Sequence, residues 1–233
     1  MPRKARCVVP DVAHHVTQRG VDRAEVFFSQ ADRETYLHLV ERNLEDAGVR
    51  VLAWTLMTNH VHWVLVPERE DSLEVLVRRV AGRYAQYLNA RKQRSGHLWE
   101  RRFFSCPVDP RHEDIVLRYV EWNPVRAAMV EAPEDHRWSS AAAHLAGPEA
   151  ESFRLLDWDD WGKRGGSAAW RELLAKPGDT GEWREVRRAT YAGAPLGTIG
   201  FQQQLEQQFG RQWRPRGRPP KVRVEDGECF SAG

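Results

Sequence analysis

The feature that most constrains the fold is an apolar stretch from Val51 to Pro67, Val-Leu-Ala-Trp-Thr-Leu-Met-Thr-Asn-His-Val-His-Trp-Val-Leu-Val-Pro. It is too long for one strand of ordinary length, and Asn59 near its middle is a residue that favours turns. The stretch therefore predicts two strands, over residues 49–57 and 60–66, joined by a tight turn. Because side chains alternate between the faces of a strand, His60 and His62 are expected on the same side of the second strand.

The histidine pair has two explanations. Residues two apart on a strand are ~6.5–7 Å apart at Cα, so two imidazoles can bind one metal ion. Two titratable rings side by side in an apolar strand also have a desolvation cost, which favours a functional explanation. Taken alone, however, the pair is better explained as two partly exposed histidines on a half-buried strand.

A second group of candidate residues lies in the segment from Asp109 to Arg126. Asp109 followed by proline is typical of a helix start. Tyr119 and Asn123 are four residues apart and are expected on one helix face, although Pro124 limits the regularity of the helix beyond Asn123. Packed against the histidine strand, they would set a nucleophile beside a metal site with two nitrogen ligands and one oxygen ligand. Considered separately, Tyr119 would be explained as a tyrosine of the core and Asn123 as a capping or turn residue before proline.

The order of the expected elements defines the fold class. The helix expected after Asp109 would be a third helix, in addition to the two of the fold named below, and it is expected near the centre of the sheet. His14 and His15 point to opposite faces of the first strand and cannot form a pair like His60 and His62. A β-α-β-β-α-β order predicts an α+β, ferredoxin-like antiparallel sheet with helices on one face. The expected strands are 12–19, 49–57, 60–66 and 102–108, and the expected helices are 33–47 and one that starts at Asp71 or Ser72.

Charge is segregated along the chain, so the net charge of +2 is uninformative. Residues 78–102 contain eight Lys or Arg against one acid, with aromatic residues interleaved, and residues 211–223 contain six Lys or Arg and no acid. A basic helix face is usually only solvated, but two basic segments favour a polyanionic partner such as nucleic acid. The candidate DNA-binding residues are Arg78, Arg79, Arg83, Tyr84, Arg91, Lys92, Arg94, Trp99, Arg101, Arg102, Arg216 and Arg218.

Composition excludes several classes of protein. No apolar run approaches the ~20 residues of a membrane span, and no apolar segment follows the basic start of the chain as in a signal peptide. The three cysteines are far apart and odd in number, which favours reduced thiols and lacks the spacing of a zinc site. These features predict a cytoplasmic protein, associated with the nucleoid if it binds DNA.

Three segments together resemble a known family: Asn59-His-Val-His-Trp-Val-Leu, Gly96-His-Leu-Trp-Glu-Arg-Arg-Phe-Phe, and Arg118-Tyr-Val-Glu-Trp-Asn-Pro-Val-Arg. The chain resembles the single-tyrosine HUH transposases, and among them the REP-associated tyrosine transposases of bacteria, over residues 12 to 145. The resemblance implies that His60, His62 and Asn123 bind a divalent cation, Mg²⁺ or Mn²⁺. It also implies that Tyr119 attacks DNA.

The implied activity is cleavage and rejoining of single-stranded, hairpin-containing DNA through a 5′-phosphotyrosine, by a monomer or a homodimer. One alternative is a domesticated DNA-binding protein or repressor without transposition activity. A hydrolytic metalloenzyme is a weaker alternative, because Glu68 lies beyond Pro67 and no other carboxylate suits the histidine pair as a general base. A covalent protein–DNA adduct would separate the three.

The resemblance also suggests how the chain is divided. Residues 1–146 are expected to form the catalytic domain, and residues 147–210, with tryptophans scattered among Gly, Pro and charged residues, a mostly helical accessory region. Residues 211–233 are expected to be a basic DNA-binding tail. Within it, Pro215-Arg-Gly-Arg-Pro219 resembles the core of an AT-hook, which lies in a narrow minor groove. A tail that binds phosphates without preference is an equally good explanation.

Overall fold

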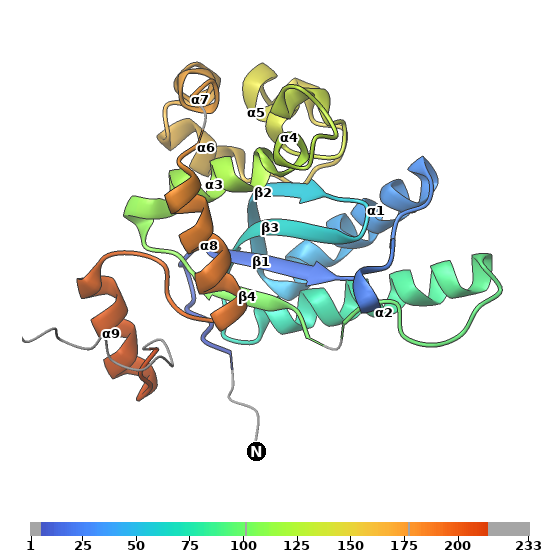
Figure 1. Ribbon diagram of the computed structural model, residues 1–233, viewed down its shortest axis with the longest axis horizontal. Helices are drawn as coiled ribbons and strands as arrows, with labels where there is room; N and C mark the ends of the chain where they lie inside the picture. The colour runs from blue at the N-terminus through green and yellow to red at the C-terminus, as the bar shows by residue number, and fades with distance from the viewer. Residues whose placement is uncertain (1–5, 101, 177, 214–233) are drawn as a thin grey trace, which may run out of the picture.

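The computed structural model describes residues 6–100, 102–176 and 178–213. Within them the sheet has four strands in the order β2-β3-β1-β4, and every neighbouring pair is antiparallel (Figure 1). This order is that of the ferredoxin-like arrangement, so the predicted fold class is confirmed. The strands are β1 (His14–Arg19), β2 (Val49–Leu56), β3 (His60–Pro67) and β4 (Phe104–Pro107).

The helices of the first half begin and end where local signals place them. Helix α1 (Gln30–Ala47) begins earlier than the predicted Arg33, because the Ser29 hydroxyl accepts a hydrogen bond from the Asp32 amide and caps the helix. Gly48 ends it in the left-handed conformation, with φ of 61°. After α2 (Ser72–Arg91), the Asp109 carboxylate caps the turn Pro110–His112, as predicted, and α3 (Glu113–Glu121) follows.

The remaining helices are short. They are α4 (Asn123–Arg126), α5 (Ala141–Ala146), α6 (Trp158–Lys163), α7 (Gly166–Leu174), α8 (Thr180–Ala192) and α9 (Ile199–Phe209). Single 3₁₀ turns lie at Val21–Arg23, Pro133–Asp135 and Pro148–Ala150. The predicted mostly helical C-terminal region is therefore confirmed. Within the described residues, no helix has both the length and the apolar character needed to cross a membrane.

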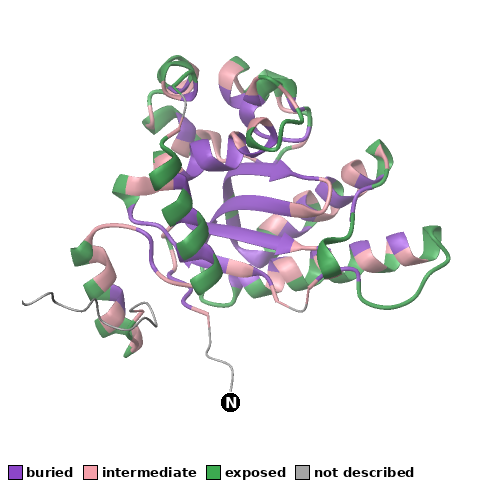
Figure 2. Ribbon diagram, viewed as in Figure 1, coloured by how far each residue is buried: buried purple, intermediate pink, exposed green. Residues whose placement is uncertain are grey.

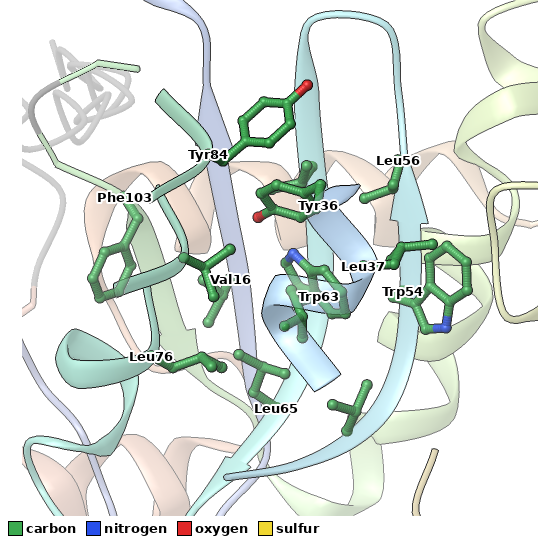
Figure 3. Packing of buried hydrophobic residues seen from close by; sticks show 14 of the residues in the cluster. Val16, Tyr36, Leu37, Trp54, Leu56, Trp63, Leu65, Leu76, Tyr84 and Phe103 are labelled. Carbon is green, nitrogen blue, oxygen red and sulfur yellow. The ribbon is translucent and has the colours of Figure 1, made fainter. Parts of the chain in front are cut away.

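Helices α1 and α2 cover one face of the sheet, here called the first face, onto which Val16, Trp63 and Leu65 project. Tyr36 of α1 and Tyr84 of α2 pack over these side chains and over each other, with ring centroids 5.2 Å apart (Figure 3). The first face thus builds an apolar and aromatic core of the ordinary kind.

The opposite, second face carries His15 and Thr17 of β1 and His62 and Val64 of β3. Helix α3 packs against β2 and β3, and α8 packs against β4, so this face is also covered (Figure 1). Figure 2 shows the strands buried while the outer sides of the helices stay exposed. The expected pair of helices on one face is present, and α3 and α8 add a third layer.

Region 147–210 contributes to this third layer. Trp161, Trp170 and Trp183 belong to the same buried cluster as Val64 of the sheet and Val116 of α3. Helices α6, α7 and α8 therefore share a core with the sheet. The division at residues 146/147 stays a prediction, and the AT-hook-like segment 215–219 lies outside the described residues.

Candidate active site

His60 and His62 lie side by side on the second face, with ring centroids 4.8 Å apart. His62 is 4% exposed, whereas His60 at the start of β3 is half-buried. Burial lowers the pKa of both imidazoles, that of His60 to about 4. Both rings are therefore neutral at physiological pH, the form in which a histidine binds a metal ion.

The neighbouring Asn59 determines which nitrogen of His60 carries the proton. The Asn59 amide nitrogen donates to the Arg23 carbonyl at 2.9 Å, so its oxygen is the atom that lies 2.6 Å from Nδ1 of His60. An amide oxygen only accepts, so His60 Nδ1 donates. In a neutral ring Nε2 then keeps its lone pair, ready to bind a cation.

A third histidine, His15, lies against His62, a contact that strand alternation alone does not predict. The prediction that His14 and His15 face opposite sides holds, but β1 is the neighbour of β3, which brings His15 to the face of His62. Its Nε2 is 2.9 Å from Nδ1 of His62, and the two rings stack with centroids 5.1 Å apart.

Tyr119, near the end of α3, points at these rings. Its ring centroid is 5.7 Å from that of His62 and 5.4 Å from that of His15, both edge-on. Tyr119 is only 3% exposed, and this burial raises the pKa of its phenol. The Arg126 guanidinium, 5.1 Å from the ring centroid, acts in the opposite direction and lowers it.

Asn123 lies just beyond α3, whose regular hydrogen bonding ends at Glu121. Its amide nitrogen donates to the Tyr119 carbonyl at 2.7 Å, which satisfies a carbonyl at the helix end and fixes the orientation of the side chain. The Asn123 oxygen is thus the atom turned away from the helix. The Thr55 hydroxyl donates to the Val120 carbonyl at 2.9 Å and holds the same helix end on β2.

These residues supply ligands that suit a divalent cation. Within the described part of the chain, no three His, Cys, Asp or Glu side chains form a metal-binding group. The available donors are two neutral imidazole nitrogens and one amide oxygen, which leave the full charge of the ion for a phosphate. By their chemistry these donors suit the predicted metal role, which stays a prediction.

Two of the predicted DNA-binding arginines line a cavity of about 740 Å³ between α2 and residues 96–103, namely Arg78 and Arg102. Arg6 lines it too, lies over the Phe103 ring at 3.7 Å and pairs with Glu74 at 3.3 Å; no local sequence pattern marks it as part of this cavity. Arg79 and Arg91 pair with carboxylates of α1, at 3.3 Å and 2.8 Å.

The structure corrects the expectation that Tyr84 and Trp99 bind DNA. Tyr84 is fully buried and its hydroxyl donates to the Val26 carbonyl at 2.6 Å. Trp99 is 6% exposed and packs in the first-face core. Arg83, Lys92 and Arg94 are exposed, and their role in DNA binding stays a prediction. Arg101, Arg216 and Arg218 lie outside the described residues.

Known proteins resemble this chain in sequence or in fold. Residues 8–123 match the family model described as "Transposase IS200 like". A REP-associated tyrosine transposase, solved bound to a REP hairpin, has 17% identity and a TM-score of 0.55, over 67% of this chain and 94% of that chain. A candidate transposase from Deinococcus radiodurans R1 has 19% identity and a TM-score of 0.37, over 52% of this chain and 96% of that chain. Curated proteins gave no significant match.

Proposed function

This chain belongs, through residues 8–123, to the IS200-like transposase family, and on that premise we propose that it cleaves and rejoins single-stranded, hairpin-containing DNA. Tyr119 is the nucleophile, and His60, His62 and Asn123 hold Mg²⁺ or Mn²⁺ beside it. The proposal assigns the chain to the REP-associated branch of the family. Support comes from its likeness in fold to a relative of that branch solved with a REP hairpin.

The observation that carries the proposal is the position of Tyr119 against the histidine strand. Its phenol ring lies edge-on to His62 and to Trp183, and the guanidinium of Arg126 lies 5.1 Å from the ring centroid. A core tyrosine such as Tyr84 instead packs against Tyr36 and Trp99, and its hydroxyl donates to a carbonyl. Tyr119 thus has the surroundings of a group that meets an anion.

In the proposed reaction the Tyr119 oxygen attacks the scissile phosphorus in line with the departing 3′ oxygen of the preceding nucleotide. The tyrosine–phosphate bond forms as the phosphorus–3′ oxygen bond breaks, the phenol loses its proton, and the 3′ oxygen takes one up. The divalent cation, when bound, neutralises the phosphate oxygens. Attack by a 3′ hydroxyl reverses the step and rejoins DNA without ATP.

Arg126 has a part in this scheme. It is exposed, and with the half-buried His60 it forms the accessible side of an otherwise buried site. We therefore place the approach of the phosphate on that side. Its positive charge stabilises both the phenolate and the incoming phosphate, because each is an anion.

The cavity lined by Arg6, Arg78 and Arg102 provides a place for the DNA backbone away from the scissile phosphate. Arginine binds phosphate through paired hydrogen bonds and is the residue best suited to such a site. Tyr84 and Trp99, which are buried, have no part in this proposal.

The test is to incubate the protein with Mn²⁺ and single-stranded hairpin oligonucleotides from its flanking genomic DNA, and to run a denaturing gel. A covalent protein–oligonucleotide band, sensitive to protease and absent in EDTA, is expected. Binding of the same oligonucleotides without any covalent product would favour the alternative of a DNA-binding protein that lacks transposition activity.

A further inference from the structure

We propose that His15 and Thr190 are positioning residues that fix the tautomer of His62, so that its Nε2 carries the lone pair. The tautomer of His62 follows from the hydrogen bonds alone. Its importance for activity rests on the proposed function, in which His62 binds the metal. Thr190 belongs to α8, outside the residues that match the family model. The C-terminal region would thereby be a working part of the site.

The direction of these hydrogen bonds is set at the hydroxyl of Thr190, a residue that is 1% exposed. This hydroxyl lies 2.7 Å from the Val186 carbonyl oxygen and 2.7 Å from Nδ1 of His15. A carbonyl oxygen can only accept, so the single hydroxyl proton of Thr190 points at Val186. The His15 contact is therefore a hydrogen bond only if His15 Nδ1 donates and the hydroxyl oxygen accepts.

The same reasoning passes through the ring of His15. Because His15 is buried and its ring nitrogens face Thr190 and His62 rather than a carboxylate, the ring is neutral and holds one proton, on Nδ1. Its Nε2 is then an acceptor, and the atom 2.9 Å away, Nδ1 of His62, must donate. A neutral His62 that donates through Nδ1 has a bare Nε2.

The contact with Val186 disfavours the opposite direction of these hydrogen bonds, in which Thr190 would donate to His15 and His15 to His62. If the Thr190 hydroxyl donated to His15, two oxygen atoms would face each other at 2.7 Å without a proton between them. The Sγ of Cys106, 3.3 Å from the Thr190 oxygen, can donate to it in either arrangement and does not alter the choice. The geometry therefore selects one direction.

His62 and His60 reach the same tautomer by different routes. His60 donates to the adjacent Asn59, within its own turn, whereas the hydrogen bonds that start at His62 cross from β3 through His15 of β1 to Thr190 of α8. Hydrogen bonds to the second nitrogen of a metal-binding histidine fix its tautomer and orientation. Removing Thr190 leaves His15 without an acceptor and allows both rings to reverse.

The first experiment measures the tautomer directly, in the metal-free full-length protein labelled with ¹⁵N-histidine. Long-range proton–nitrogen NMR spectra distinguish protonated from bare ring nitrogens, and His15→Phe and His62→Ala assign the signals. Native protein should show His62 protonated at Nδ1, and Thr190→Val should shift the proton toward Nε2. Thr190→Ser, which keeps the hydroxyl, should restore the native pattern.

Ser105→Ala is the matched control, because it removes another buried hydroxyl, one with no hydrogen-bond partner within the described residues. It should leave the His62 pattern unchanged. A native spectrum with the proton on His62 Nε2 would overturn the inference, as would a native pattern in Thr190→Val.

The second experiment titrates Mn²⁺ into the same proteins by calorimetry, with circular dichroism to confirm folding. Thr190→Val should bind Mn²⁺ about 10–100-fold more weakly than Thr190→Ser, the usual effect of losing such a partner. Equal affinities would overturn the coupling to the metal site. If the tautomers behave as expected but His62→Ala binds Mn²⁺ as well as native protein, the inference stands and the metal assignment in the proposed function fails.

Discussion

The two faces of the sheet are both covered by helices, but the first face is packed with aromatic and aliphatic side chains whereas the second also contains buried polar side chains. On the first face, Trp63, Tyr36 and Tyr84 pack ring against ring, and stability comes from apolar area removed from water. On the second face, α3 carries a buried carboxylate, Glu121, and α8 carries the buried hydroxyl of Thr190. The second face can stay buried only because its polar groups find partners.

Glu121 shows how such a group is paired, although the indole nitrogens of Trp161 and Trp183 in the same cluster have no hydrogen-bond partner within the described residues. Its carboxylate accepts from Ser140 Oγ at 2.5 Å, from His144 Nδ1 at 2.5 Å and from Trp170 Nε1 at 2.9 Å. These partners tie the helix of Tyr119 to α5 and α7. The comparison teaches that the second face gains fixed orientation from its hydrogen bonds, which a catalytic site needs and a purely apolar core does not supply.

The sharpest test applies one substitution to both faces, removal of a tyrosine hydroxyl. Tyr119→Phe should abolish the covalent DNA adduct while oligonucleotide binding persists and the melting temperature scarcely moves. Tyr84→Phe should behave in reverse, with adduct formation retained and about 1–2 kcal/mol of stability lost, because the Val26 carbonyl loses its 2.6 Å hydrogen bond. Denaturing gels and urea unfolding measure the two effects.

An adduct formed by Tyr119→Phe would assign the nucleophile elsewhere. If Tyr84→Phe also lost the adduct at unchanged stability, the division of roles between the two faces would be wrong.

The second prediction concerns the histidines of the second face. Replacing both His60 and His62 with alanine should abolish cleavage, to the same extent as EDTA acting on native protein, because both treatments remove the cation that neutralises the phosphate. His38→Ala is the control, since His38 lies on α1 with its side chain 62% exposed. Full cleavage by native protein in EDTA would contradict the metal assignment.

The third prediction tests whether the second face depends on its hydrogen bonds for stability. Glu121→Ala leaves three buried donors without their acceptor and should cost about 3–5 kcal/mol, as breaking a buried pair does. Leu65→Ala on the first face should cost about 2–5 kcal/mol through the cavity alone. The two variants should differ in the rate of adduct formation, measured under conditions in which both variants are folded. Only Glu121→Ala should also slow adduct formation, because it frees the helix of Tyr119.

Much of this arrangement was predictable because it depends on local rules. Strand alternation placed His60 and His62 on one face, Asp109 before proline begins a helical turn as predicted, and Gly48 ends α1 at the predicted residue. The basic, aromatic segment was a weaker guide. Tyr84 lies at helical spacing from Val80 and Leu88, and that pattern already indicated a buried position.

His15, Thr190 and Arg6 could not be found in the same way, because their roles depend on which elements become neighbours. Alternation assigns His15 a face of β1, and the ferredoxin-like order places β1 next to β3, but neither gives the pairing register that brings His15 to His62. Thr190 is 175 residues from His15, and nothing in the composition of its helix marks it as a partner. Long-range placement of this kind follows from the packing of the whole sheet.

The smallest expected effect separates two adjacent residues, His14 on the first face and His15 on the second. His14 is fully buried, donates through Nδ1 to the Val12 carbonyl and accepts from the Val9 amide. Burial lowers its pKa from 6.5 to about 4, so the unfolded chain binds a proton in this range that the folded chain does not. Its neutral form therefore contributes stability that is complete above pH 6.5 and is lost as pH falls toward 4.

Replacing His14 with glutamine should reduce the dependence of unfolding free energy on pH between 4 and 6.5 by up to one proton. This amounts to about 1.4 kcal/mol per pH unit. His15 and His60, whose pKa values are also lowered, remain in both proteins, so urea unfolding at a series of pH values isolates the contribution of His14. Because His14 has no contact with the second face, the His62 tautomer should stay native in this variant. An unchanged pH dependence would show that His14 titrates alike in the folded and unfolded chains, and a changed tautomer would show that the two faces are coupled through β1.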